Sequence, residues 1–93
     1  MTPFEFLQDW YASACDGDWE HSYGIRIETT DNPGWMLVVD LEGTPLRGRC
    51  YEKEDAAVDG SWMSARSDGK EFIAACDPHS LDSAINSFVE FAG

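Results

Sequence analysis

Positive charge is missing from both ends of this 93-residue chain. Residues 1–22 and residues 71–93 contain no lysine or arginine, and all six cations lie between Arg26 and Lys70. The formal net charge is −12, and most of the excess comes from these two ends. Such a field repels nucleic acid and anionic membranes and attracts basic partners. A high negative charge also serves solubility alone, so the charge leaves both interpretations open.

Long apolar runs and paired cysteines are also missing. No stretch of about 18 apolar residues is present, which excludes a membrane-spanning helix of the usual length. The sequence Met-Thr-Pro-Phe-Glu at the N-terminus has neither a basic region nor an apolar signal core, so we expect a cytoplasmic protein. The three cysteines, Cys15, Cys50 and Cys76, form no Cys-x-x-Cys pair. An odd number without such a pair argues against a disulfide framework and fits a reducing compartment.

The apolar residues that are present, 43% of the chain, are enough for the core of one domain covering residues 1–93. Thr2, Pro3 and Glu5 form a helix-start pattern, and Asp16-Gly17 predicts that this helix ends near Cys15. A second apolar stripe with helical spacing follows Ser80, a candidate N-cap, and runs to Ala92.

Between the two helices the pattern changes to the alternation of β-strands, and five strands are predicted over residues 23–29, 35–42, 47–54, 62–67 and 71–76. The loop Thr30–Gly34 joins the first two strands as a hairpin. We therefore predict an α+β fold: an N-terminal helix, an antiparallel five-stranded meander sheet and a C-terminal helix, with both helices packed on one sheet face. Ile27 and Trp35 are expected on the core side.

No catalytic or metal-binding set stands out. A calcium loop starting at Asp16 fails, because its sixth and twelfth positions are His21 and Ile27 rather than Gly and Glu. Cys15 with His21, and Cys76 with His79, lack the usual spacing of a structural zinc site. The carboxylates near Cys15 disfavour a thiolate. We therefore predict no catalytic, cofactor-binding or metal-binding residues, and keep a small thiol- or metal-dependent enzyme as the alternative.

The densest polar and aromatic cluster lies just after the first helix. It is predicted to contact a partner, and its members are Asp16, Asp18, Trp19, Glu20 and His21. Trp19 is the one aromatic side chain in this set that has the character of an interface anchor. The structural alternative is that the tryptophan anchors the core and that the carboxylates form a solvated or locally bonded cluster.

Several of these residues also carry a family resemblance. The segments Trp10-Tyr11, Cys15–His21, Tyr23–Ile25 and Asp31–Trp35 resemble the immunity protein 53 family of bacterial polymorphic toxin systems, and Asp40–Thr44 and the last helix extend the similarity. The resemblance is strongest over residues 10–44 and implies a cytoplasmic antidote, not an enzyme. It implies a protein that binds a cognate toxin and blocks it. The acidic ends of the chain then favour a toxin with a basic surface, one candidate being a nuclease.

Overall fold

The computed structural model describes all 93 residues. Helix α1 (Pro3–Ala14) begins with the capping box that the sequence predicts. The Thr2 hydroxyl accepts a hydrogen bond from the Glu5 backbone N–H at 3.1 Å, and the Glu5 carboxylate accepts one from the Thr2 N–H at 3.0 Å. The helix ends at the Cys15 cap, before Asp16-Gly17, as expected. No helix of the chain has the length and apolar character needed to cross a bilayer.

The five predicted strands form one antiparallel sheet. Their bounds are β1 (Ile25–Thr29), β2 (Trp35–Asp40), β3 (Cys50–Ala56), β4 (Trp62–Asp68) and β5 (Glu71–Cys76). Strands β1 and β2 form the predicted hairpin, in which Ile27 lies opposite Leu37. The sheet order is β1-β2-β5-β4-β3, so β1 and β3 are the two edges.

This order corrects one detail of the prediction, because the sheet is not a meander throughout. Strand β2 pairs with β5, and the chain between residues 41 and 49 crosses the end of the sheet to reach the far edge. The reason lies in composition: β5 alternates buried Phe72, Ala74 and Cys76 with half-buried residues, whereas β3 carries mostly charged and exposed side chains. The apolar strand therefore takes the central place and the charged strand takes the edge.

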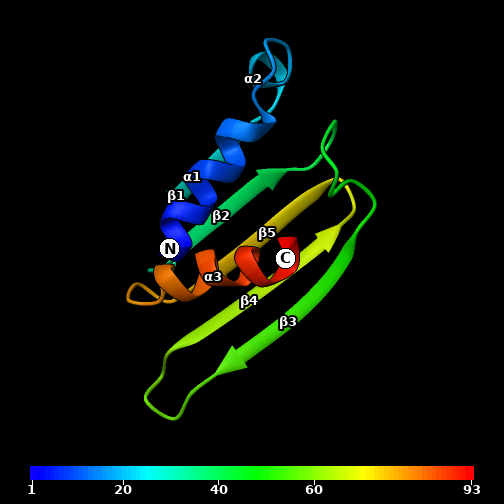
Figure 1. Ribbon diagram of the computed structural model, residues 1–93. Coiled ribbons are helices and arrows are strands. Elements are labelled where there is room, and N and C mark those ends of the chain that lie inside the picture. The colour runs from blue at the N-terminus through cyan, green and yellow to red at the C-terminus, as the bar shows by residue number, and fades with distance from the viewer.

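Both helices cover the same face of the sheet (Figure 1). Helix α3 (Leu81–Ala92) packs on β5 and β4, and Phe88 is fully buried against Phe72, with ring centroids 5.3 Å apart. Helix α1 packs on α3 through the rings of Phe6 and Trp10, which lie 6.4 Å and 5.1 Å from that of Phe88. Ser80 does not cap α3 with its side chain as expected, because its hydroxyl donates to Asp77 instead.

The second face of the sheet has no covering layer (Figure 1). Met36, Val38, Ile73 and Ala75 form an apolar strip along its two central strands, and Val38 is buried even there. On the covered face α1 is drawn over β1 (Figure 1), and residues of α1 line a hollow together with Gly24 and Ile25. Ile27 lies opposite the buried Leu37 and so shares the covered face, as expected, but 37% of it is exposed.

Candidate functional site

The predicted partner-binding cluster forms a tight loop and a one-turn helix, α2 (Trp19–Ser22), beyond the end of α1 (Figure 1). The Asp16 carboxylate accepts hydrogen bonds from the backbone N–H groups of Asp18 and Trp19, at 2.9 and 3.0 Å. The Glu20 carboxylate accepts others from the N–H groups of Asp16 and Gly17. These two carboxylates therefore hold the loop closed. The sequence did not predict α2, since one helical turn leaves no periodic pattern.

Trp19 anchors this loop to the rest of the fold. It is only 5% exposed, and its indole N–H donates to the Glu42 carbonyl oxygen at 2.8 Å. Its ring contacts those of Trp10, Tyr11 and Tyr23, with centroids 6.0 to 6.2 Å apart. In the free chain Trp19 is thus a structural residue.

Two members of the predicted cluster make no such structural contacts. Asp18 and His21 are exposed, and no hydrogen bond or ion pair involves their side chains. The prediction that all five residues contact a partner stays a prediction. Their geometry separates Asp16, Trp19 and Glu20, which build the loop, from Asp18 and His21, which point into solvent.

Beside α2, at the same end of the sheet, residues from three segments, two of which supply carboxylates, line a groove of about 390 Å³. We call it the acidic groove, and its residues are Tyr23, Asp40, Glu42, Asp68, Lys70 and Glu71. The contact between Trp19 and Glu42 joins the groove to α2. The groove was not predicted. Its members are scattered over nearly fifty residues, and only the β2–β5 pairing, which sets Asp40 opposite Glu71, brings them together.

The groove carboxylates are held by neighbouring backbone and side chains. Asp68 accepts hydrogen bonds from the N–H groups of Lys70 and Glu71, which lower the pKa of its carboxyl. Asp40 accepts from the Gly24 N–H at 2.9 Å, and Glu42 pairs with Arg47 at 2.6 Å. Glu42 is the only groove carboxylate in an ion pair, and Lys70 also lies in the groove, where its charge contributes to the lowered pKa of Asp68. Four carboxylates against Lys70 and Arg47 leave the groove with a net negative charge.

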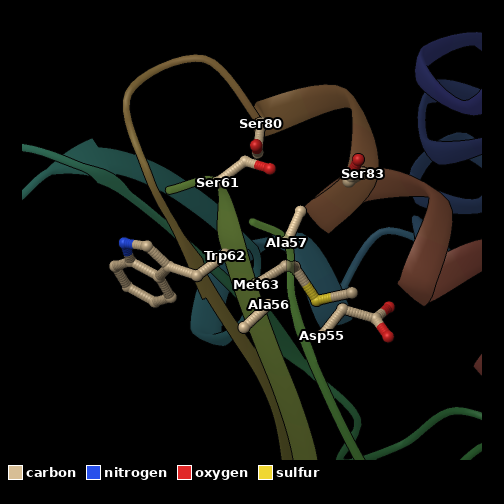
Figure 2. Close-up of a pocket in the computed structure, with 8 residues that line it drawn as sticks. All are labelled: Asp55, Ala56, Ala57, Ser61, Trp62, Met63, Ser80 and Ser83. Carbon is tan, nitrogen blue, oxygen red and sulfur yellow. The ribbon is translucent and has the colours of Figure 1, made fainter. Parts of the chain in front are cut away.

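A different hollow, of about 290 Å³, lies at the opposite end of the sheet, between the β3–β4 hairpin and the start of α3. Figure 2 shows Ser80, the residue before α3, and Ser83 of α3 facing the hairpin, while the Trp62 ring points away from them. Asp55 is the only ionisable residue in the lining, so the hollow has no acid–base pair or nucleophile with a neighbouring base.

The cysteines and histidines of the alternative enzyme hypothesis do not meet. Cys15 and His21 lie near α2, whereas Cys76 and His79 lie at the other end of the sheet (Figure 1). No group of three or more potential metal ligands occurs in the structure. Cys76 is fully buried, and this burial raises the pKa of its thiol, which disfavours the reactive thiolate.

The relation to known proteins agrees with the sequence resemblance. Searches of curated proteins and of solved structures gave no match. The family model described as immunity protein 53 matches residues 4–93, which include α1, the loop with α2, the whole sheet and α3. A match over nearly the full length shows membership, so the chain belongs to the immunity protein 53 family and is an immunity protein against a toxin.

Proposed function

We propose that this immunity protein neutralises its toxin by stoichiometric binding, and that the acidic groove and the exposed side of α2 form the contact surface. The observation that carries the proposal is the convergence of Asp40, Glu42, Asp68 and Glu71 on one groove at the α2 end. Carboxylates gathered from separate strands give a stronger local field than the same charges spread over a surface.

The groove also has features of a protein interface rather than a small-molecule site. Tyr23 lies on its rim and is 40% exposed, although its ring packs on Trp19. Tyrosine is enriched among residues that dominate binding energy, because it gives a large rigid contact and a polar group. Asp18 and His21 extend the polar rim along α2.

The partner that fits this surface has a basic face. A toxin that acts on nucleic acid offers such a face, because its substrate channel must attract phosphates. Acidic side chains docked there would block the channel and exclude the substrate without any chemical step. Such a protein acts where the toxin does damage, and we therefore propose that it acts in the cytoplasm.

Association kinetics with the toxin test the proposal. The groove variant carries Asp40→Asn, Glu42→Gln and Glu71→Gln, which remove charge and keep shape. The matched control carries Asp31→Asn, Glu54→Gln and Asp82→Asn, three exposed carboxylates away from the groove, with the same total charge change. At low salt the groove variant should associate on the order of tenfold more slowly than wild type, and the control at close to the wild-type rate.

The toxin for this measurement is the product of the neighbouring reading frame, mixed with the immunity protein in stopped flow. Raising the salt concentration should bring the groove variant and wild type together, because screening removes the steering field. Equal slowing in both variants would show that net charge matters and the groove does not. Wild-type rates for both would place the interface on another face.

A further inference from the structure

The β1 edge of the sheet is open for pairing. Gly24 accepts a hydrogen bond from the Asp40 N–H, and Thr30 donates to the Gly34 carbonyl. Because backbone groups alternate along an antiparallel strand, these bonds show that Arg26 and Glu28 direct their N–H and C=O groups toward β2. The N–H and C=O groups of Ile25, Ile27 and Thr29 therefore point outward, away from the sheet. No loop or side chain bonds to the outward-facing groups. β1 is an edge strand of the sheet and pairs only with β2.

Apolar surface lies beside this edge on the helix side. Ile27 is 37% exposed, Phe4 47% and Tyr11 40%, which are large fractions for such side chains. Phe4 and Tyr11 of α1, together with Ile25 of β1, line a hollow of about 300 Å³ next to the edge. A strand added to β1 would cover Ile27 and would bring its own side chains against this hollow.

On the open face the same strand carries two charges of opposite sign. Arg26 and Glu28 are exposed and take part in no ion pair or side-chain hydrogen bond. Arg26 is also the only cation in residues 1–46 of this acidic chain. Arg26 and Glu28 flank Ile27 on either side. When a second copy of the strand lies antiparallel with Ile27 opposite Ile27, Arg26 of one copy therefore comes opposite Glu28 of the other.

We propose that β1 is a self-pairing edge, and that a second copy of this chain is its partner. In an antiparallel pair centred on Ile27, each Ile27 lies opposite its counterpart and each Ile25 lies opposite Thr29. These three pairs exchange about six backbone hydrogen bonds. Each Arg26 then faces Glu28 of the other copy, at the position where cross-strand side chains are closest. A two-fold axis through the Ile27 pair makes the contact self-complementary.

This arrangement joins two sheets into one continuous sheet and places both α1 helices on its same face. Phe4 and Tyr11, which are partly exposed, line the hollow next to the paired edge. A contact of one short strand and a few side chains is at the small end of protein interfaces, so the dimer is weak and depends on concentration. The acidic groove opens at the end of the sheet and stays accessible.

Charge exchange at β1 tests the pairing. Arg26→Glu sets Glu opposite Glu28, and Glu28→Arg sets Arg opposite Arg26, so each variant alone should be at least about tenfold weaker in dimerisation than wild type. An equimolar mixture of the two variants should form heterodimers, because every facing pair is again of opposite sign. The double variant Arg26→Glu/Glu28→Arg should dimerise like wild type.

Sedimentation velocity over a concentration series up to about 1 mM gives the association constants, since a contact this small is expected to be weak. Arg66→Glu is the matched control, because it makes the same charge change on the same open face but on β4, and it should dimerise as wild type does. Circular dichroism of each variant shows that the fold is kept.

Wild-type protein that stays monomeric over the whole range overturns the proposal. The proposal also fails if the mixture of variants stays monomeric, or if Arg26→Glu and wild type dimerise equally. Monomeric wild type combined with loss of toxin binding in Arg26→Glu would show that the edge takes a toxin strand instead. The groove variant of the previous section keeps β1 intact, so the two proposals fail independently.

Discussion

The two ends of the sheet are fastened in the same way but differ in what they leave exposed. At the α2 end Trp19 donates its indole N–H to the Glu42 carbonyl at 2.8 Å, and at the α3 end Trp35 donates to the Pro78 carbonyl at 3.0 Å. Each end also has an aspartate that accepts backbone N–H bonds, Asp16 at the first and Asp77 at the second. At each end of the sheet, therefore, one tryptophan N–H and one aspartate carboxylate hold the loop in place through hydrogen bonds.

The difference lies in the remaining charge. At the α3 end Asp77 is 8% exposed and its oxygens accept from Trp62, His79 and Ser80, so its charge is used inside the fold. At the α2 end the loop is closed by Asp16 and Glu20, and the groove adds carboxylates from other strands. One buried aspartate makes these contacts at the α3 end, whereas the α2 end gathers several carboxylates, of which Asp40 and Asp68 also accept backbone hydrogen bonds.

The largest expected loss of stability follows from removing Trp19 or Trp35, the tryptophans that bond to a carbonyl at each end of the sheet. Trp19→Ala should lower the free energy of unfolding by about 3–5 kcal/mol, because it empties a buried site between three aromatic rings. Trp35→Ala should cost less, about 2 kcal/mol, because that side chain is only half-buried. Chemical denaturation of both variants gives the two values. Equal losses would mean that exposure does not distinguish the two ends.

Trp19→Phe separates packing from the hydrogen bond at the α2 end. It keeps an aromatic ring and removes the indole N–H, so the Glu42 carbonyl loses its donor and about 1 kcal/mol of stability is expected to go with it. Gly43 lies against the Trp19 ring with a positive φ of 77°, and a Cβ there would be 3.3 Å from the indole. A loss from Trp19→Phe as large as that from Trp19→Ala would place most of the energy in the indole itself.

Most of the fold could be predicted from the sequence because its signals are local. The capping box, the Asp16-Gly17 helix stop, the first hairpin and strand β5 follow from neighbouring residues, and all are present. The strand order could not be predicted from neighbouring residues, because it depends on which of the later strands pairs with the free edge of β2. The contrast between apolar β5 and charged β3 was the available signal.

The site was harder to predict because it is assembled by tertiary contacts. The polar cluster around Trp19 was visible as a run in sequence, but nothing in it shows that Asp16 and Glu20 are occupied by backbone N–H groups. The acidic groove depends on the pairing of Asp40 with Glu71 and on the turn at Asp68, far apart in the chain. The charge distribution of the sequence predicts a partner with a basic surface, whereas the acidic groove could be located only from the fold, because its residues are far apart in the chain.

An intermediate effect is expected on acid stability. Hydrogen bonds lower the pKa of Asp16 and Asp77 below the ordinary value of 3.8: the largest contribution comes from the Trp19 N–H for Asp16, and from the Ser80 hydroxyl for Asp77. The bonds favour the charged form in the folded state, so their stabilisation is present above about pH 3.8 and is lost as the pH falls through the lowered values. Unfolding free energies measured from pH 6 down to about pH 2 should therefore fall steeply below about pH 4.

Asp77→Asn should remove part of this acid dependence, because an amide does not titrate. Asp82→Asn is the control, since its exposed carboxylate accepts no hydrogen bond and its loss should leave the slope unchanged. If Asp16→Asn reduces the pH dependence of the unfolding free energy as much as Asp77→Asn does, the two aspartates contribute equally to acid stability and the two ends of the sheet are alike in this respect. An unchanged slope in both would contradict the assignment of these aspartates as charged caps.

The smallest effect on stability is expected at the exposed side of α2. Asp18→Asn and His21→Ala should change the free energy of unfolding by no more than about 0.5 kcal/mol, because neither side chain has a partner in the folded chain. If these residues extend the acidic groove as a rim, Asp18→Asn should still slow association with the toxin at low salt, whereas the remote Asp82→Asn should not. His21→Ala should act on dissociation if the imidazole packs against the toxin. A variant pair that alters neither stability nor toxin kinetics would confine the contact surface to the groove and remove α2 from it.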